Sequence, residues 1–522
     1  MNAVQDGFDE TADVVVVGSG GAALAAAYTA ASGGLSTIVL EKTEYFGGTS
    51  AYSGASIWLP GNQALERAGL ADSVELGKEY FRTVVGNRTP GFLQEAFLST
   101  GPELVEFLEN DPLLRFEYRP FPDYFEAPGR ITGGRSICPL PLPSAELGTW
   151  LDRLRPPIAT DQFGVDQDRA TLIGGQALIG RFLLALDATG NASLRTRTRM
   201  TSLIIEDGRV TGVVVETENG TRRICAERGV VLAAGGFECD DELRIRHHGL
   251  PGGRWTSAAP GSNTGDALAA LREAGAAVDL MDEAWWCPAT LFPNGRAAFT
   301  LGLRGGILVN AAGERFANES LPYDRMGHEI LRGQATGVSH IPVWFVFDDR
   351  FDTIPAISQP APDAAAFREA GLWRTAGTLA GLAGLIDVPA DALEKTVERF
   401  NGFAASGVDE DFHRGEDPFD RFFAAGEGPN PCLTPLERGP FHAVQIVLGD
   451  LGTKGGARTD EDGRVLNESG TPVPGLYAAG NSAASVAGHV YPGPGTPLGS
   501  GMVFGYRAAR RMASPEHAAQ PR

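Results

Sequence analysis

Residues 13–41 of the 522-residue chain read DVVVVGSGGAALAAAYTAASGGLSTIVLE, and their pattern indicates the fold class. It begins with an apolar strand over 13–17 and continues directly into the turn GSGGAA at 18–23, which has the spacing GxGxxA. An alanine-rich helical stretch follows, and Ser36 to Leu40 reads as a second strand that ends at Glu41. This order predicts a dinucleotide site, with the pyrophosphate at the helix N-terminus and the Glu41 carboxylate on a ribose.

A second glycine turn lies just past this acid, in the segments GGTS at 47–50 and SG at 53–54. A turn at this place resembles the flavoprotein pattern, in which it passes along FAD. No second GxGxxG sequence stands on another strand-helix turn, so we expect no site for a nicotinamide cofactor. Electrons are therefore expected to come from the substrate and to leave to a quinone-like electron acceptor.

Later segments continue the pattern of a nucleotide-binding sheet. A hairpin is predicted over Ser202 to Glu216, because the Asp-Gly pair in its middle favours tight turns. Buried strands that end in small residues are predicted at 229–236 (GVVLAAGG) and at 475–481 (GLYAAGN). In GSNTGDAL at 261–268, Asp266 is expected at the head of a helix.

Together these segments resemble the FAD domain of the glutathione reductase and fumarate reductase type. The expected fold class is α/β, with a Rossmann-like FAD-binding domain of the glutathione reductase type built from both chain ends, and an inserted α+β catalytic or capping domain. Helical periodicity from Asp391 to Phe403 and a cluster of aromatic residues before it mark the insertion. The FAD-binding domain is expected at 1–284 and 451–522, and the insertion at 285–450.

The same resemblance implies FAD held without a covalent bond. Contacts to FAD are expected from the two glycine turns, from Glu41 and the adjacent Lys42, from the ends of the later strands, and from the start of the last helix. The expected contact residues are Gly18, Ser19, Gly20, Ala22, Ala23, Glu41, Lys42, Gly47, Gly48, Thr49, Ser50, Ser53, Gly54, Ala234, Gly235, Asp266, Gly480, Asn481, Pro497 and Leu498.

Charge and composition exclude several classes of function. The net charge of −21 argues against nucleic acid or an anionic membrane as a partner, because either would need a basic face. The five cysteines lack CxxC spacing and the eight histidines lack HExxH spacing, so we expect neither a disulfide framework nor a metal site. The N-terminus has no signal-peptide core, and no apolar run approaches the ~20 residues of a membrane span. We expect a cytoplasmic protein without a transmembrane segment, and we leave open a loose association with a membrane surface.

The clearest motif of the expected insertion is GGILVNAAGERFANESLPYD at 305–324. The fumarate reductase family carries a similar segment, in which an arginine stands before the final aspartate as acid catalyst. Here that place is taken by Tyr323. The family's later arginine, which binds a substrate carboxylate after the GLYAAG turn, is replaced by Tyr491. Loss of both cations removes dicarboxylate binding and acid catalysis, so we do not expect reduction of C4-dicarboxylates.

Both replacements are tyrosines, and a third tyrosine, Tyr124, ends the sequence FPDY. With FPDY, NExxxY and YPGxG in this order and at similar separations, almost the whole chain resembles the 3-ketosteroid Δ1-dehydrogenases. The resemblance implies a small-molecule 3-ketosteroid substrate in steroid degradation. It implies that Tyr323, helped by Tyr124, takes a proton from C2 while the C1 hydrogen passes as hydride to flavin N5. Tyr491 and the backbone N–H of Gly495 would hold the C3 carbonyl oxygen.

The chemistry of these residue types supports the same roles. A C–H bond beside a ketone becomes acidic only if the enolate oxygen is stabilised, which a phenol and a rigidly held backbone N–H can do. Because an unperturbed tyrosine has a pKa of about 10, Tyr323 needs a neighbouring hydroxyl to stabilise its phenolate, and Tyr124 is the candidate. Taken without its motif, Tyr124 is typical of a half-buried packing residue. His489, close to Tyr491 in the sequence, could tune the site, although a structural role is the simpler interpretation.

Two other interpretations stay open at this point. A related flavin-dependent desaturase of the Δ4-(5α) type would share the cofactor and the ketosteroid, but the complete set of three tyrosine motifs argues against it. A flavin-binding protein without turnover, such as a carrier or a redox sensor, would not reduce its own flavin with a steroid.

Overall fold

The computed structural model describes residues 7–424 and 426–514, and the chain divides into two compact units. The first unit takes the chain up to Leu250, the segment Ala258–Ala284 and the part from Gly452 onward. The second unit comprises Pro251–Ser257 and Trp285–Leu451. Each unit has its own sheet and its own buried core.

An eight-stranded sheet in the first unit joins both ends of the chain. Its strand order is β21-β22-β11-β1-β2-β8, and the antiparallel pair β9–β10 continues from β11. The pairings of β22 with β11, β11 with β1, β1 with β2, and β2 with β8 are all parallel. The strands are β1 (Glu10–Val17), β2 (Thr37–Leu40), β8 (Ala192–Arg195), β9 (Arg199–Glu206), β10 (Arg209–Thr217), β11 (Gly220–Leu232), β21 (Arg464–Leu466) and β22 (Pro472–Ala478).

The elements predicted around the glycine turn are confirmed, with small shifts at their ends. β1 begins at Glu10 instead of Asp13. β2 begins at Thr37 because the backbone N–H and hydroxyl of Ser36 donate to the Asp13 carboxylate at 2.8 and 2.7 Å. The predicted hairpin is β9–β10, and Asp266 is the first residue of a helix, as expected.

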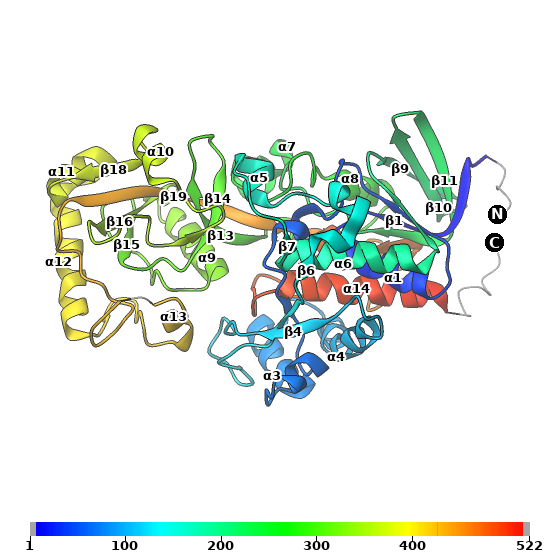
Figure 1. The fold of residues 1–522 in the computed structure, drawn as a ribbon, viewed down its shortest axis with the longest axis horizontal. Helices are drawn as coiled ribbons and strands as arrows, with labels where there is room; N and C mark the ends of the chain where they lie inside the picture. The colour runs from blue at the N-terminus through cyan, green and yellow to red at the C-terminus, as the bar shows by residue number, and fades with distance from the viewer. Residues whose placement is uncertain (1–6, 425, 515–522) are drawn as a thin grey trace. The chain divides into compact units, whose positions relative to one another are not determined.

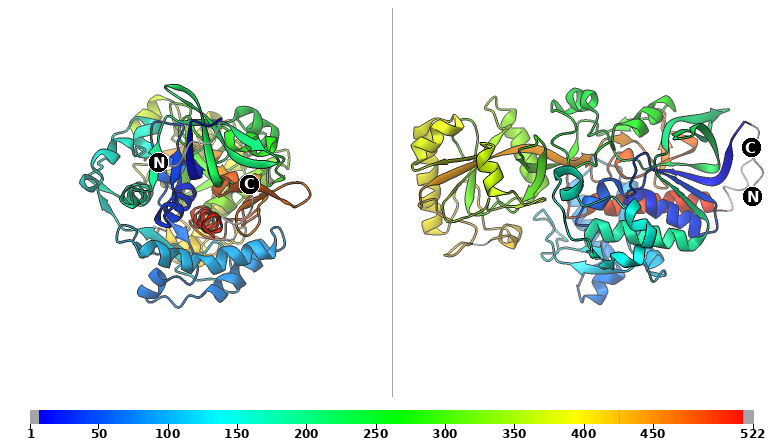
Figure 2. Two further views of the ribbon diagram at one scale, coloured as in Figure 1. Left: turned by 90° about the vertical axis from the view of Figure 1, so that its right-hand side faces the viewer. Right: turned by 45° about the horizontal axis from the view of Figure 1, so that its top comes forward.

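Helices from opposite ends of the chain pack together in the first unit. Figures 1 and 2 show α1, in blue, side by side with α14, in red. The α-helices are α1 (Gly21–Ser32), α2 (Gln63–Arg67), α3 (Val74–Val85), α4 (Gly91–Glu109), α5 (Ile158–Phe163), α6 (Gly174–Thr189), α7 (Asp241–His248), α8 (Asp266–Glu273) and α14 (Thr496–Ala513). The 3-10 helices are η1 (Gly48–Tyr52), η2 (Ser144–Arg153) and η3 (Gly480–Ser482), and the short strands are β3 (Ile57–Trp58), β4 (Phe116–Arg119), β5 (Ser136–Pro139), β6 (Leu142–Pro143), β7 (Thr171–Leu172), β12 (Val278–Asp279) and β20 (Gly456–Ala457).

The turn between β1 and α1 requires glycine at its first position. Gly18 has a φ of +107°, and a Cβ there would overlap the carbonyl oxygen of Ala233. A larger residue would therefore push the turn away from the end of β11. Because α1 begins three residues after Gly18, its N-terminus lies at the carboxyl edge of the parallel strands, where open α/β sheets bind ligands.

The second unit contains a seven-stranded sheet in the order β15-β16-β19-β13-β14-β17, with β18 paired to β19. Residues of β15, β16 and β19 form one buried core with α11 and α12. The helical periodicity predicted from Asp391 to Phe403 is confirmed as α12. The elements are β13 (Ala284–Leu291), β14 (Ala297–Leu301), β15 (Gly306–Val309), β16 (Val343–Asp348), β17 (Ile357–Ser358), β18 (Trp373–Ala376), β19 (Phe441–Thr453), α9 (Tyr323–Gln334), α10 (Ala364–Glu369), α11 (Leu379–Ile386), α12 (Ala390–Ser406) and α13 (Pro418–Phe422).

Candidate active site

The N-terminus of α1 is open to an anionic ligand. Its N-cap residue, Gly20, has no side chain to cap the helix, and the Ser50 hydroxyl accepts a hydrogen bond from the Gly21 N–H at 3.0 Å. The N–H groups of Ala22 and Ala23 lie in the first turn and have no carbonyl partner within the helix. A helix N-terminus of this kind favours the negative charge of a pyrophosphate.

Glu41 is buried, and its carboxylate is held by neighbouring residues. Its Oε2 accepts a hydrogen bond from the Ser19 hydroxyl at 2.5 Å, and its Oε1 accepts from the Thr43 N–H at 2.8 Å. The Gly47 N–H donates to Ser19 Oγ at 2.9 Å, which ties the second glycine turn to the first. Because each carboxylate oxygen can accept more than one hydrogen bond, the oriented Glu41 keeps capacity for ribose hydroxyls.

The structure brings Lys42 and Asp266 together as an ion pair at 2.9 Å, and Arg199 also pairs with Asp266 at 3.0 Å. Burial acts to raise the pKa of the Asp266 carboxyl. The charges of Lys42 and Arg199, and their hydrogen bonds, outweigh burial and hold this pKa below its usual range. A nucleotide at this end would therefore meet two cations and one carboxylate, with one positive charge left over.

Small residues after β11 and β22 lie beside the second glycine turn. The Asn263 side chain donates to Thr49 Oγ1 at 3.2 Å, and a Cβ on Gly235 would overlap this Asn263 amide. The Ala234 N–H donates to the hydroxyl of Ser482 at 3.0 Å, which links this strand end to η3, where Gly480 and Asn481 stand. In the same unit, the Gly175 N–H at the start of α6 donates to the carbonyl of Ser53, next to Gly54, at 2.8 Å.

Predicted contact residues from both chain ends meet around α1 and α14. A Cβ on Gly21 would stand 3.0 Å from Leu498 Cδ2, and a Cβ on Gly480 would stand 3.1 Å from the Ala22 Cβ. Pro497 lies in the first turn of α14. Backbone N–H groups in a first turn have no partner within the helix, so proline costs no helix hydrogen bond there. Two uncapped helix N-termini, turns of small residues and an oriented carboxylate fit a dinucleotide cofactor such as FAD.

Tyr491 and Gly495 form a pair of polar groups in the turn before α14. The Gly495 N–H donates to the phenol oxygen of Tyr491 at 3.2 Å, so both groups lie within reach of one small acceptor. Gly495 has a φ of +95°, and a Cβ there would overlap the carbonyl of Ser56, so only glycine can present its N–H here. The Tyr124 ring packs edge-to-face on Tyr491, with the centroids 5.4 Å apart. Tyr124 is fully buried, whereas the sequence taken alone suggested a half-buried residue.

Donors from four separate segments of the first unit hold the carbonyl groups of this turn. The hydrogen bonds run from the Tyr124 N–H (3.0 Å) and the Tyr80 hydroxyl (2.6 Å) to Pro492, from the Ser136 hydroxyl to Pro494 (2.5 Å), and from the Trp58 N–H to Gly495 (3.3 Å). A turn whose backbone is held at three carbonyl groups has little freedom, so the Tyr491 and Gly495 groups are preorganised.

Asp123, the residue before Tyr124, is a buried charge that fixes the FPDY segment. Its carboxylate accepts hydrogen bonds from Trp58 Nε1 at 2.8 Å and from Arg135 at 3.0 Å. Burial raises the pKa of Asp123, although the Arg135 charge acts against this rise. Sequence reasoning missed Trp58, Arg135 and Tyr80, because no local pattern distinguishes them from core residues.

Tyr323 belongs to the second unit and is the first residue of α9, directly after the N-cap Pro322. Its side chain is buried, and its ring packs edge-to-face on Phe299, with the centroids 5.0 Å apart. Phe299 lies on β14. It supports the phenol of Tyr323 on one side, within the same unit.

The NE part of the NExxxY motif is structural. Glu319, four residues before Tyr323, pairs with Arg315 at 2.8 Å and with Arg414 at 2.9 Å, and all three side chains are buried. Arg315 also pairs with Asp409 at 2.7 Å. Burial acts to raise the pKa of Asp409, but the Arg315 hydrogen bonds and charge outweigh it and hold that pKa below its usual range. This buried ion cluster fixes the loop that leads into Tyr323.

His489 joins three segments next to the Tyr491 turn. Arg88 Nε donates to His489 Nε2 at 2.6 Å, and His489 Nδ1 lies 2.9 Å from the Glu283 carboxylate. Arg88 pairs in turn with Asp279 at 2.7 Å. These contacts support a structural role for His489.

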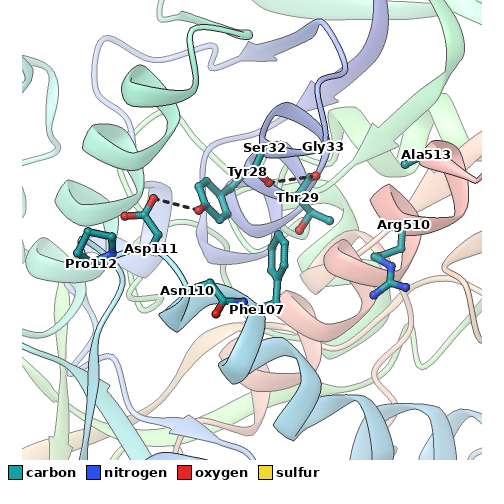
Figure 3. A pocket seen from close by; sticks show the side chains of 10 residues that line it. All are labelled: Tyr28, Thr29, Ser32, Gly33, Phe107, Asn110, Asp111, Pro112, Arg510 and Ala513. Carbon is teal, nitrogen blue, oxygen red and sulfur yellow. Dashed lines mark hydrogen bonds between the residues drawn. The ribbon is translucent and has the colours of Figure 1, made fainter.

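A cavity of about 560 Å³ opens elsewhere on the first unit (Figure 3). Its walls come from the C-terminal ends of α1, α4 and α14, whereas the predicted cofactor contacts lie at the N-terminal ends of α1 and α14. Tyr28 and Phe107 line it with their rings 5.7 Å apart, and the Tyr28 hydroxyl donates to Asp111 at 3.0 Å. This cavity is therefore separate from the candidate active site.

The described part of the chain holds neither a metal-binding cluster nor a membrane-spanning helix. Within residues 7–424 and 426–514, no three side chains of His, Cys, Asp and Glu gather closely enough to hold a metal ion. No helix in the described part of the chain combines the length and the apolar character needed to cross a bilayer.

Comparison with known proteins agrees with this geometry. Residues 13–498 match the family model of the FAD binding domain. The chain is 41% identical to a 3-oxosteroid 1-dehydrogenase of Mycobacterium tuberculosis, over 96% of this chain and 98% of that protein. The crystal structure of 3-ketosteroid Δ1-dehydrogenase from Sterolibacterium denitrificans, in complex with 1,4-androstadiene-3,17-dione, superposes with a TM-score of 0.89 at 34% identity, covering 97% of this chain and 99% of that one.

A second solved structure bears on the alternative desaturase. The 3-ketosteroid Δ4-(5α)-dehydrogenase from Rhodococcus jostii superposes with a lower TM-score of 0.68 at 25% identity, over 98% of both chains. The mixed α/β fold, the cofactor cradle and the family match define a flavoprotein with an FAD-binding domain. Within that class, the chain belongs to the family of the 3-oxosteroid 1-dehydrogenases.

Proposed function

We propose that this protein catalyses the FAD-dependent 1,2-dehydrogenation of 3-ketosteroids in steroid degradation. The observation that carries the proposal is the pair of Tyr491 hydroxyl and Gly495 N–H, 3.2 Å apart and packed against Tyr124. This pair stands on an FAD-binding domain of the glutathione reductase type that uses both chain ends, with the second unit as the inserted catalytic domain. The 41% identity to a 3-oxosteroid 1-dehydrogenase supports the same reaction.

The proposed roles follow from what each group can do. Tyr491 and Gly495 donate hydrogen bonds to the C3 carbonyl oxygen, and these bonds strengthen as the oxygen gains enolate charge. Tyr323 is the base that takes the C2 proton, and the hydroxyl of Tyr124 stabilises its phenolate. Bound FAD supplies the acceptor for the hydride from C1. Because the proton leaves C2 and the hydride leaves the adjacent C1, the electron pair of the broken C2–H bond forms the new C1–C2 double bond.

The electron acceptor and the setting are part of the same proposal. The sequence offers no second nucleotide fingerprint for a nicotinamide, so the reduced enzyme passes its electrons to a quinone-like acceptor. We propose a cytoplasmic enzyme, with any membrane contact limited to a loose association through its surface. The substrate is a neutral small molecule, because both positions where a carboxylate would need a cation carry tyrosine.

Anaerobic mixing with 4-androstene-3,17-dione tests the proposal against its alternatives. A Δ1-dehydrogenase should lose its oxidised flavin absorbance and form 1,4-androstadiene-3,17-dione. A Δ4-(5α) enzyme would leave this steroid unchanged but would desaturate a 5α-reduced 3-ketosteroid at C4–C5. A flavin-binding protein without turnover would keep its flavin oxidised with both steroids.

The cofactor should be FAD, released intact when the protein is denatured. Glu41 is held in a fixed orientation beside the first glycine turn, and FMN has no adenosine ribose for it to bind. Chromatography of the supernatant after heat or acid denaturation measures the released flavin. Recovery of FMN, or colour that stays with the precipitated chain, would contradict this expectation.

Fumarate should not reoxidise the reduced enzyme at a useful rate. Neither Tyr323 nor Tyr491 carries the positive charge by which an arginine would neutralise a dicarboxylate. The measurement is flavin reoxidation in an anaerobic stopped-flow experiment after chemical reduction, with an artificial quinone as the positive control. Reoxidation by fumarate as fast as by the quinone would refute the assignment of these two positions.

A further inference from the structure

Tyr80 connects the two loops that carry Tyr124 and Tyr491. It lies on α3, whose place is labelled in Figure 1, and its side chain is fully buried. Its hydroxyl donates to the Pro492 carbonyl at 2.6 Å and accepts from the Phe125 N–H at 3.0 Å. Pro492 follows Tyr491 directly, and Phe125 follows Tyr124 directly, so one hydroxyl bridges the backbones next to both residues.

The contact pattern requires a hydroxyl group. The Pro492 carbonyl can only accept a hydrogen bond, and the Phe125 N–H can only donate one, so the bridging atom must do both. The same Pro492 carbonyl also accepts from the Tyr124 N–H at 3.0 Å, which closes a hydrogen-bonded ring through Tyr80. The ring fixes the distance between the two loops within the first unit.

The ring of Tyr80 is held in place by its own packing. It lies against the Trp58 ring, with the centroids 6.2 Å apart, and under the Arg135 guanidinium at 5.5 Å. Burial, together with the nearby charge of Asp123, raises the pKa of the Tyr80 phenol well above its usual range. This environment disfavours the ionised form of Tyr80, which suits a hydroxyl that donates one hydrogen bond and accepts another.

We propose that Tyr80 is a positioning residue of the steroid reaction, whose hydroxyl sets the geometry of the Tyr124–Tyr491–Gly495 group. This inference rests on the proposed function, and it adds a fourth tyrosine that acts through the other residues without touching the substrate. Loss of the hydroxyl leaves the Phe125 N–H without this acceptor and lets the Pro492 turn relax. The donors to the C3 oxygen then lose alignment, and their effect is largest in the transition state.

The test replaces Tyr80 by phenylalanine, which keeps the ring and removes only the hydroxyl. Anaerobic flavin reduction by saturating 4-androstene-3,17-dione should slow by roughly 10- to 100-fold per bound flavin, because small misplacements of catalytic groups cost rate on this scale. Steroid affinity, followed by perturbation of the flavin spectrum, should change much less. The rate of flavin reduction should be lower at every pH, and its dependence on pH should be the same as in the wild type. Tyr506→Phe is the matched control, because its hydroxyl bonds to Glu103 and Arg510 away from this turn.

A double-mutant cycle with Tyr491→Phe separates positioning from general stability. If Tyr80 acts through the Tyr491 turn, Tyr80→Phe should cost clearly less in the Tyr491→Phe background than in the wild type. Full additivity, or a Tyr80→Phe rate equal to that of Tyr506→Phe, would overturn the inference while leaving the proposed function intact. Failure of the wild type to reduce its flavin with any 3-ketosteroid would overturn the proposed function, and this inference with it.

Discussion

Replacement of Tyr323 by phenylalanine should abolish reduction of the bound flavin by steroid while leaving steroid binding largely intact. Loss of a general base costs roughly 10²–10⁴-fold in rate, and no other tyrosine stands between residues 285 and 451 to replace it. Phenylalanine keeps the edge-to-face contact with Phe299, so the start of α9 should not change. Anaerobic stopped-flow absorbance of the flavin measures the rate, and flavin spectral perturbation measures bound steroid.

The control for this variant is again Tyr506→Phe, which should reduce its flavin at the wild-type rate. The buried ion cluster around Glu319 should keep the Tyr323→Phe chain folded, because none of its bonds involves the phenol. Flavin reduction in Tyr323→Phe at close to the wild-type rate would mean that the C2 proton goes to another residue, and the assignment of the base would then be wrong.

The nucleotide-binding part of the fold could be predicted because its signals are local. The apolar run of β1, the glycine turn and the acid of Glu41 lie within 29 consecutive residues, and the structure confirms the strand, helix and strand that they predict. The hairpin β9–β10 follows from one Asp-Gly pair. Such patterns fix φ and ψ over a few residues, and tertiary packing shifted only their ends.

The support of the candidate site could not be predicted in this way. The hydroxyl of Tyr80 and the carbonyl of Pro492 are separated by 412 positions in the sequence, and nothing near either residue indicates the partner. Arg414 and Glu319 likewise form a hydrogen bond although 95 positions separate them in the sequence. The motifs NExxxY and FPDY contain Glu319 and Asp123, but the motifs do not indicate the role of either residue. The structure assigns Glu319 to a buried ion cluster and Asp123 to the anchoring of Trp58 and Arg135.

Replacement of Tyr491 by phenylalanine should lower the rate of flavin reduction by roughly 10²–10³-fold, the usual cost of one lost oxyanion donor. The Gly495 N–H remains in this variant, because it is fixed by the backbone of the turn and not by the phenol. The loss should therefore be partial, and it should appear mainly in the rate at saturating steroid. Tyr124→Phe should be milder, because Tyr124 only assists the base.

Gly495→Ala disturbs both donors of the pair at once, so its comparison with Tyr491→Phe separates the contribution of the phenol from that of the backbone N–H. An alanine Cβ would overlap the Ser56 carbonyl at a φ of +95°, so the turn must move and both the N–H and the Tyr491 hydroxyl lose their places together. We expect this variant to lose at least as much rate as Tyr491→Phe, and the double variant to lose little more than Gly495→Ala alone. Rates are compared per bound flavin, which removes any difference in folding yield. If Tyr491→Phe retained the wild-type rate while Gly495→Ala did not, the enolate would be held by the backbone N–H alone, and the phenol of Tyr491 would have no part in stabilising it.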